Sequence, residues 1–255
     1  RFEWFNQRSK DFELLSPKCF FTDDSVISLA ICDALMKCTE NFSDLSDQAV
    51  SSMQEVGRHY RHCGYGGSFF RWMYSNNPKP YNSYGNGAAM RVSGCGHVGT
   101  SINEVKQLSR SVTEVTHNHP EGLKGAEATA TAVFLARTGK SINEIKNYIV
   151  KNYYSLDFTI DDIRETYKYN ETCQDTVPQA LEAFFESTDF EDAIRNAISI
   201  GGDSDTLAAI TGSVAEAYYG VPTSIRKRAI TFLDERLLEI LLEFESRYPA
   251  KIEDK

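Results

Sequence analysis

The stretch Ile198–Gly220, ISIGGDSDTLAAITGSVAEAYYG, decides how the chain is interpreted. Two glycines precede a polar cluster that consists of Asp203, Ser204, Asp205 and Thr206. Small and apolar residues follow at helical spacing, which predicts a helix over 205–219 with carboxylates and hydroxyls at its start. Thr and Asp are good N-caps, and Asp in a first turn complements the helix dipole, so capping explains this cluster when it is taken alone.

A second cluster of the same kind lies near the beginning of the chain. The segment CFFTDDSVISLAICDAL (19–35) places Thr22, Asp23 and Asp24 before another apolar-periodic helix. If the fold brings the two helix starts together, four carboxylates converge, and such a group cannot stay fully ionised without a cation. Hard oxygen ligands suit Mg²⁺, Mn²⁺ or Ca²⁺ rather than Zn²⁺. The two clusters together therefore favour a divalent-cation site over two separate caps.

Helical periodicity dominates the rest of the chain, which predicts a single compact all-α domain over residues 1–255. Helices are predicted from Ser25 onward and over 44–61, 102–113, 122–137, 141–152, 178–186, 190–199, 205–219 and 226–245. The segment SLDFTI (155–160) is a candidate strand or a helix entry. The segment 61–99 is rich in Gly, Asn, Pro and aromatic residues, and long loops of this kind are often functional.

Composition excludes several classes of protein. The 255 residues carry a net charge of −9, which disfavours sequence-independent nucleic-acid binding and attachment to anionic membranes. No apolar run approaches the ~20 residues that cross a bilayer, and no signal peptide is visible at Arg1, although the chain does not begin with Met. The six cysteines form no regular framework, so we expect reduced thiols and a cytoplasmic location.

Three further motifs have a structural and a functional interpretation. His117 and His119 in VTHNHPEG fit a turn before a helix, with Pro120 near its first position. A ligand-contacting or structural role for these histidines is preferred to metal binding, because no Cys or third His stands at zinc-ligand spacing. The pieces GYGGS (64–68) and SYGNG (83–87) could present amides to phosphate, but on composition alone they are turns.

Taken in order, FTDDSV, SYGNGAAMRVSGCG, THNHPEGLKGAEATA and GGDSDTLAAITGSVAEAYYG resemble the ADP-ribosylglycohydrolase family from Arg1 to about Gly220. The resemblance implies a roughly orthogonal multi-helix fold with two divalent cations, Mg²⁺ or Mn²⁺, in a central cleft. The metal ligands that it implies are Thr22, Asp23, Asp24, Asp203, Asp205 and Thr206. The substrate-binding residues that it implies are Gly66, Gly67, Ser83, Tyr84, Gly85, Asn86 and His117.

The resemblance implies a metal-dependent hydrolase that releases ADP-ribose from an ADP-ribosylated protein or small molecule. The candidate catalytic acids are Glu3, Asp23, Asp24 and Asp205. Family members carry a GDxxG helix before the acid that matches Glu3, and this sequence opens at RFEW without it. The alternatives are a non-catalytic ADP-ribose-binding, nucleotide-binding or structural member of the fold, and an unrelated helical phosphohydrolase. The acceptor and the oligomeric state stay open.

Overall fold

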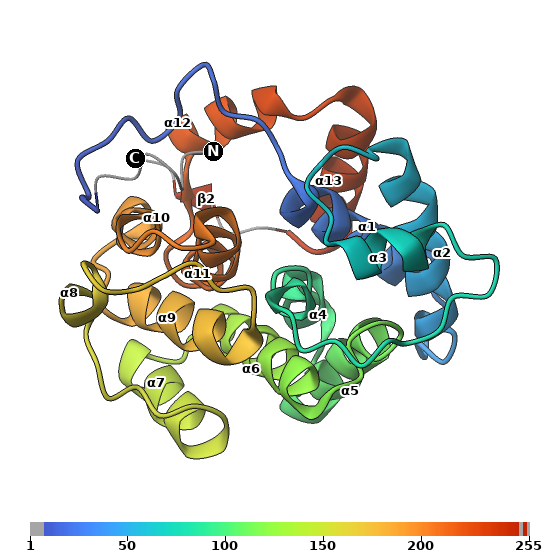
Figure 1. Cartoon of the computed structure of the whole chain (residues 1–255), viewed down its shortest axis with the longest axis horizontal. Helices are drawn as coiled ribbons and strands as arrows, with labels where there is room; N and C mark the ends of the chain where they lie inside the picture. The colour runs from blue at the N-terminus through green and yellow to red at the C-terminus, as the bar shows by residue number, and fades with distance from the viewer. Residues whose placement is uncertain (1–7, 250–251, 254–255) are drawn as a thin grey trace.

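The computed structural model describes residues 8–249 and 252–253 of the 255-residue chain. The first helices are α1 (Asp23–Lys37), α2 (Leu45–His59), α3 (Gly67–Met73), η2 (Asn86–Ala88), α4 (Ser93–Val98), α5 (Ile102–Thr113) and α6 (Pro120–Arg137). They are followed by α7 (Ile142–Asn152), α8 (Ile160–Ile163), α9 (Cys173–Phe185), α10 (Phe190–Ser199) and α11 (Ser204–Tyr219). The chain continues through α12 (Thr223–Ala229), η3 (Ile230–Phe232) and α13 (Glu235–Arg247) (Figure 1). The predicted all-α class is confirmed.

Helix α6 is the central element, and it packs against α4, α5, α7, α9 and α11. Its small side chains, which include Ala126, Ala128, Ala130 and Ala132, are all buried and allow its neighbours to approach closely. One of these close approaches is made by Gly96 of α4. A Cβ at Gly96 would lie 2.7 Å from the carbonyl oxygen of Ala130, so no larger residue fits there without a shift of the backbone. The alanine-rich sequence of α6 thereby fixes the spacing of the helices around it.

The two acid-bearing helices belong to different packing groups that meet beside α4. Helix α1 packs against α2 and α13, whereas α11 packs against α9, α10 and α6. Figure 1 shows α4 between these two groups, and both α1 and α11 also contact α4. Segments about 180 residues apart in the sequence are thus brought to one region of the molecule.

Several predicted boundaries were wrong, each for a local reason. Helix α9 begins at Cys173 and continues through Pro178, whereas the prediction placed Pro178 at the first position, where proline is most common. The helix predicted over 226–245 is divided into α12, η3 and α13. The division occurs because the Asp234 side chain accepts a hydrogen bond from the Leu237 amide at 3.0 Å and starts a new helix.

Short elements inside loop-rich segments were not predicted. Helices α3 and α4 and the turn η2 lie within the segment 61–99, where turn residues mask the helical pattern. The candidate strand at 155–160 is a helix entry instead, because Thr159 caps α8 through the Asp162 amide at 3.2 Å. Among the described residues the one strand pairing joins β1 (Val221–Pro222) in parallel to β2 (Ile252–Glu253).

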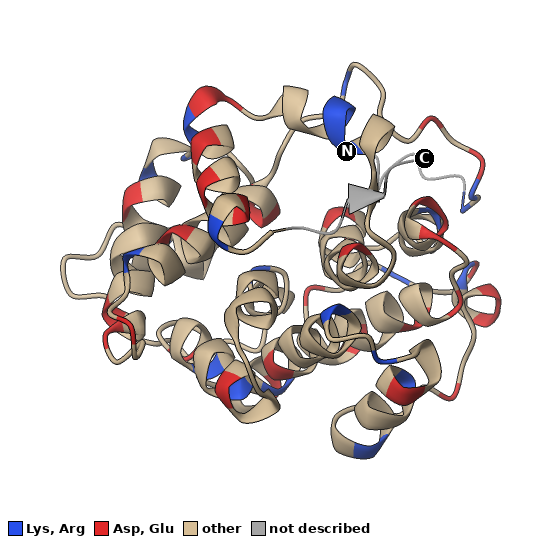
Figure 2. Ribbon diagram, turned by 180° about the vertical axis from the view of Figure 1, so that it is seen from behind, with Lys and Arg blue, Asp and Glu red and all other residues tan. Residues whose placement is uncertain are grey.

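The surface and the cysteines agree with the composition. All six cysteines are free. Within residues 8–249 and 252–253, no helix combines the length and apolarity that crossing a membrane requires. Figure 2 shows Lys and Arg interspersed with Asp and Glu on the outer helices, and no continuous basic stripe is visible along the described ribbon.

Candidate active site

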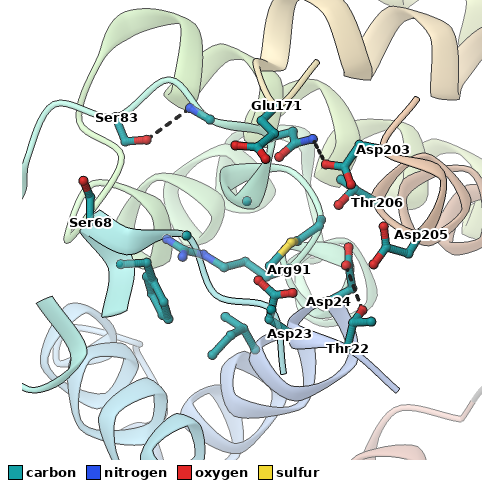
Figure 3. A pocket seen from close by; sticks show the side chains of 18 of the residues that line it. Thr22, Asp23, Asp24, Ser68, Ser83, Arg91, Glu171, Asp203, Asp205 and Thr206 are labelled. Atoms are coloured by element: carbon teal, nitrogen blue, oxygen red, sulfur yellow. Dashed lines mark hydrogen bonds between the residues drawn. The ribbon is translucent and has the colours of Figure 1, made fainter. Parts of the chain in front are cut away.

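A cavity of about 490 Å³ opens where the starts of α1 and α11 meet the glycine-rich loops. Side chains of the predicted site line it and converge on it in Figure 3. The predicted residues among its walls are Thr22, Asp23, Asp24, Gly66, Gly67, Ser83, Gly85, Asn86, His117, Asp203, Asp205 and Thr206. The convergence that the two acid clusters required is therefore present. The roles of these residues stay predictions.

The start of α1 does not use its polar residues as a cap. Thr22 occupies the N-cap position, but its side chain makes no capping hydrogen bond. Its hydroxyl instead donates to Oδ2 of Asp24 at 3.1 Å. Asp24 is 6% exposed, and its Oδ1 has no hydrogen-bond partner among the described residues. A buried carboxylate oxygen without a donor is costly, so this geometry is not explained by helix stability.

The start of α11 shows the same pattern. Gly201 and Gly202 adopt φ angles of +71° and +70°, a conformation that favours glycine and turns the chain sharply before the helix. Asp203 sits at the N-cap position without a capping bond and accepts from Nδ2 of Asn86 at 2.7 Å. The Oδ1 atom of Asp205 is buried and has no hydrogen-bond partner among the described residues. Capping therefore accounts for neither cluster.

Electrostatics in the cavity are those of crowded acids. Burial and, next in size, the neighbouring charge of Asp205 raise the pKa of Asp23 to about 7. Burial raises the pKa of Asp24 well above its usual value, and the charges of Asp205, Asp23 and Asp203 act in the same direction. One cation among these oxygens would replace their mutual repulsion with attraction.

The donor set fits a hard divalent cation, with one restriction on its geometry. Asp24 and Asp205, each with one buried carboxylate oxygen that has no partner among the described residues, line the same cavity as Thr22 and Thr206. Such oxygen-rich sets suit Mg²⁺ or Mn²⁺. Across the described residues, however, no three His, Cys, Asp or Glu side chains are close enough to hold one ion. A cation here would need hydroxyl or ligand oxygens in addition to one or two carboxylates.

The SYGNG loop forms a second wall of the cavity and is joined to the acids. The Gly85 amide donates to Oγ of Ser83 at 3.1 Å, and the Asn86 amide donates to the Glu171 carbonyl at 2.7 Å. His117 lies under this loop and is 5% exposed. Its Nδ1 lies 2.7 Å from Oγ1 of Thr116, and burial holds its pKa well below the usual range. His117 is therefore neutral.

Some predicted residues lie elsewhere. Tyr84 is not among the walls of the cavity; it is 46% exposed and its ring centroid is 5.1 Å from that of His119. His119 itself caps α6 by accepting from the Glu121 amide at 3.1 Å, with Pro120 at the first position, as the structural interpretation predicted. Glu3 lies outside the described residues, and its role stays a prediction.

Sequence reasoning missed several residues of the cavity. Glu171 and Tyr169 line it from the segment that leads into α9, and the Tyr169 hydroxyl donates to the Glu171 carboxylate at 2.5 Å. They stand in no motif, so no signal in the sequence could have found them. Arg91 also lines the cavity; it lies within the SYGNGAAMRVSGCG segment that carried the resemblance, but it was not predicted as a site residue. The signal in the sequence that could have identified it was a charged residue within a mostly apolar segment.

Comparison with known proteins places these features in a family. A family model described as ADP-ribosylglycohydrolase matches residues 3–249. The chain is 28% identical over 185 residues to the ADP-ribosylhydrolase ARH3 of Homo sapiens, with 54% of this chain and 51% of that protein covered. It is 27% identical over 220 residues to the ADP-ribosyl-[dinitrogen reductase] glycohydrolase of Rhodospirillum rubrum, with 78% of this chain and 69% of that protein covered. The chain spans about half the length of human and bovine ARH3.

A solved structure named ADP-ribosylglycohydrolase-related protein complex superimposes on the chain with a TM-score of 0.59. The match covers 94% of this chain and 90% of that chain at 21% sequence identity. This likeness establishes a shared fold.

Proposed function

Since the chain belongs to the ADP-ribosylglycohydrolase family, we propose that it is a divalent-cation-dependent hydrolase of the glycosidic bond between ADP-ribose and an acceptor. The observation that carries this proposal is the pair of uncapped helix starts. Each of them places in the wall of one cavity an aspartate whose buried carboxylate oxygen has no partner in the described part of the chain. A binding module that needed no cation would gain nothing from this arrangement, because the unpartnered oxygens destabilise the fold. The free thiols support a cytoplasmic location.

Two Mg²⁺ or Mn²⁺ ions are proposed to bind at the acidic end of the cavity. The residues that would hold them are Thr22, Asp23, Asp24, Asp203, Asp205 and Thr206. When bound, such ions hold ribose hydroxyls and polarise the sugar. Because the described carboxylates do not gather in threes, the hydroxyls of Thr22 and Thr206 would be needed in the ligand set.

The protein's own residues supply the remaining chemistry. Asn86 holds Asp203 through its side-chain amide and so keeps one acid from turning away from the cavity. The neutral His117 places its Nε2 near Gly85 and Gly87, since a Cβ at either glycine would lie within 3.7 Å of that atom. A neutral imidazole at this place can accept a hydrogen bond from a sugar hydroxyl without repelling a cation.

Cleavage of the glycosidic bond also needs a group that orients water or protonates the departing acceptor. Glu3, Asp23, Asp24 and Asp205 remain the candidates for this step. Asp23, Asp24 and Asp205 also stand in the proposed ligand set, so a bound cation would keep them ionised and suited to orient water rather than to donate a proton. Glu171, which faces the same cavity, is an additional carboxylate that the sequence did not indicate.

The proposal is tested by the release of free ADP-ribose from arginine-linked, serine-linked and small-molecule ADP-ribosyl conjugates, in Mg²⁺, in Mn²⁺ and in EDTA. We expect release from at least one substrate with either metal and none in EDTA. Asp24→Asn should abolish release, whereas the surface variant Asp47→Asn should not. Binding of ADP-ribose without release from any conjugate would indicate the non-catalytic alternative. Release of inorganic phosphate would indicate a phosphohydrolase.

A further inference from the structure

Arg91 is buried beside the cavity with its charge unbalanced. The residue is 1% exposed and is the largest fully buried side chain in the described chain. No carboxylate of the described residues lies within 4 Å of its guanidinium. A buried charge is usually paired, because removal of an ion from water carries a large desolvation penalty. Arg91 is therefore an exception that needs an explanation.

Part of the guanidinium has a structural role. Nη2 donates to the Val112 carbonyl at 3.2 Å and to Oγ1 of Thr116 at 2.6 Å, which ties Arg91 to the end of α5. The Phe69 ring centroid is 6.0 Å from its Cζ. These contacts hold the side chain in place, but they are all to neutral groups. Nε remains buried with no hydrogen-bond partner among the described residues.

The cavity that Arg91 lines is the place where an anionic partner for its guanidinium could bind. Of the described residues that line it, Arg91 is the one Lys or Arg, whereas Asp23, Asp24, Asp203, Asp205 and Glu171 are all acidic. Figure 3 shows the Arg91 side chain on the side of the pocket that holds Ser68 and Ser83. Asp24, Asp203, Asp205 and Thr206 gather on the opposite side. The cavity thus has an acidic end and a basic end.

A ligand that fills this cavity has to match both ends. Its anionic part is attracted by Arg91, whose guanidinium stays charged at neutral pH even though burial lowers its pKa to about 10. Arginine is well suited to such a site, because its planar fork binds phosphate oxygens through more than one N–H group. A diphosphate joined to a sugar satisfies the polarity of the cavity, with the sugar at the acidic end.

We propose that Arg91 is the anchor for the diphosphate of the ligand, and that it fixes which end of an ADP-ribosyl group enters the acidic side of the cavity. This inference rests on the proposed function. Arg91 would contact the diphosphate through its charge, in addition to any contacts from the backbone amides of the glycine-rich loops. The ligand's phosphate oxygens would supply the negative charge that no neighbouring carboxylate of the described residues provides. Arg91 is then a binding residue, in addition to its contacts with α5.

The test measures the affinities of ADP, ADP-ribose and adenosine for the whole chain by calorimetry in saturating Mg²⁺. Arg91→Gln keeps a polar side chain of similar length but removes the charge. We expect it to weaken ADP and ADP-ribose by roughly 10- to 100-fold, the range of charge-assisted hydrogen bonds, and to leave adenosine within about twofold. The ratio of adenosine to ADP dissociation constants is decisive, because a purely structural defect would change both alike.

A second variant keeps the test decisive if Arg91→Gln does not fold. Arg91→Lys retains the charge but lacks the fork, and we expect the same ratio to fall by several-fold only. The matched control is Arg137→Gln, since Arg137 also donates to two groups, the carbonyls of Gly96 and Gly99, but does not line the cavity. It should change thermal stability and leave the ratio unchanged.

The outcomes separate this inference from the proposed function. An unchanged ratio in a folded Arg91 variant overturns the role of Arg91, whether or not the wild-type chain releases ADP-ribose. Failure of the wild-type chain to bind ADP more tightly than adenosine overturns it as well. ADP binding that depends on Arg91, together with no ADP-ribose release from any conjugate, supports the anchor and overturns the hydrolase proposal alone.

Discussion

This molecule has two kinds of helix start, which use the same residue types for different purposes. At the start of α7, Oγ of Ser141 accepts from the Glu144 amide at 3.3 Å, and the Glu144 carboxylate accepts from the Ser141 amide at 2.9 Å. Both partners of this capping box are satisfied. At the starts of α1 and α11, threonine and aspartate occupy equivalent positions, yet neither makes a capping bond.

The contrast appears most clearly in the carboxyl groups. The hydrogen bond from the Ser141 amide lowers the pKa of Glu144 to about 2, whereas burial raises the pKa of Asp23 to about 7. A capping acid is stabilised as an anion by its own helix. Asp23 and Asp24 are destabilised as anions by burial and by neighbouring acids, which is the condition of a site that awaits a cation or works as an acid. The following experiments test whether this difference in environment is a difference in function.

The largest effect is expected when one acid of each kind is removed. Asp205→Ala should reduce Mn²⁺ affinity by more than the ~10- to 100-fold that changes around a metal's ligands produce. It should not lower the melting temperature of the metal-free protein, because it removes a buried oxygen without a partner. Calorimetry with Mn²⁺ and thermal unfolding in EDTA measure the two quantities.

The matched control is Asp189→Ala at the start of α10. Asp189 caps that helix by accepting from the Asp192 amide at 2.8 Å, so its loss should lower the melting temperature. Its Mn²⁺ affinity should equal that of the wild type. Equal metal binding by Asp205→Ala and wild type would end the idea that the two helix starts form a cation site.

The next effect concerns pH. The pKa of Asp23 in the folded state, about 7, exceeds its ordinary value of 3.8, so the folded protein binds more protons than the unfolded chain between these pH values. Stability of the metal-free protein is therefore lost as pH rises from about 4 to about 7, by up to about 4 kcal/mol for this group. Asp23→Asn should remove this loss, and its stabilising effect should be larger at pH 8 than at pH 5.

Denaturant unfolding of both proteins in EDTA at pH 5 and pH 8 gives the comparison. Repetition with Mn²⁺ should reduce the pH dependence of the wild type, because the cation replaces the protons. A stabilisation by Asp23→Asn that does not change between the two pH values would mean that Asp23 is ionised throughout.

The sequence indicated the two acid clusters and the glycine-rich loops that line the cavity, but not Glu171, Tyr169 or Arg91. Two clusters at helix starts are recognisable, because residue type and helical spacing are both local properties. Glu171 enters the cavity only because its carbonyl receives the Asn86 amide and its segment folds back across the SYGNG loop. That contact depends on tertiary packing between residues 85 apart, which no local pattern records. Arg91 was overlooked for a similar reason, since its burial is set by α5 and Phe69.

The fold shows the same division between local and non-local causes. Helices α5, α7 and α10 were predicted with correct or nearly correct bounds, because each has a capping residue and a strong apolar period. The predicted helix over 226–245 failed at Asp234, although the cap is visible in the sequence. Apolar residues continue at helical spacing across the break, and this spacing led to the prediction of a single helix despite the capping residue.

A smaller effect is expected at the SYGNG loop, which contacts Asp203 through Asn86. A Cβ at Gly85 would lie 3.3 Å from Oγ of Ser83 and 3.4 Å from the Glu171 carbonyl oxygen, so the branched side chain of Gly85→Val must enter the cavity or displace the loop. We expect ADP-ribose affinity to fall by about tenfold, the effect of one lost polar contact, with Mn²⁺ affinity retained. Unchanged ADP-ribose affinity would show that the loop is only a turn.

The smallest effect is expected at the satisfied helix start. Ser141→Ala removes the cap of α7 and leaves the Glu144 amide without its side-chain acceptor, which should lower the melting temperature by about 2–4 °C. Neither residue lines the cavity, so Mn²⁺ affinity and ADP-ribose affinity should equal those of the wild type. This variant measures what a threonine, serine or aspartate at a helix start contributes when capping is its whole role. If Thr22→Ala caused the same loss of stability and no loss of metal binding, the start of α1 would be an ordinary cap, and the distinction between the two kinds of helix start would disappear.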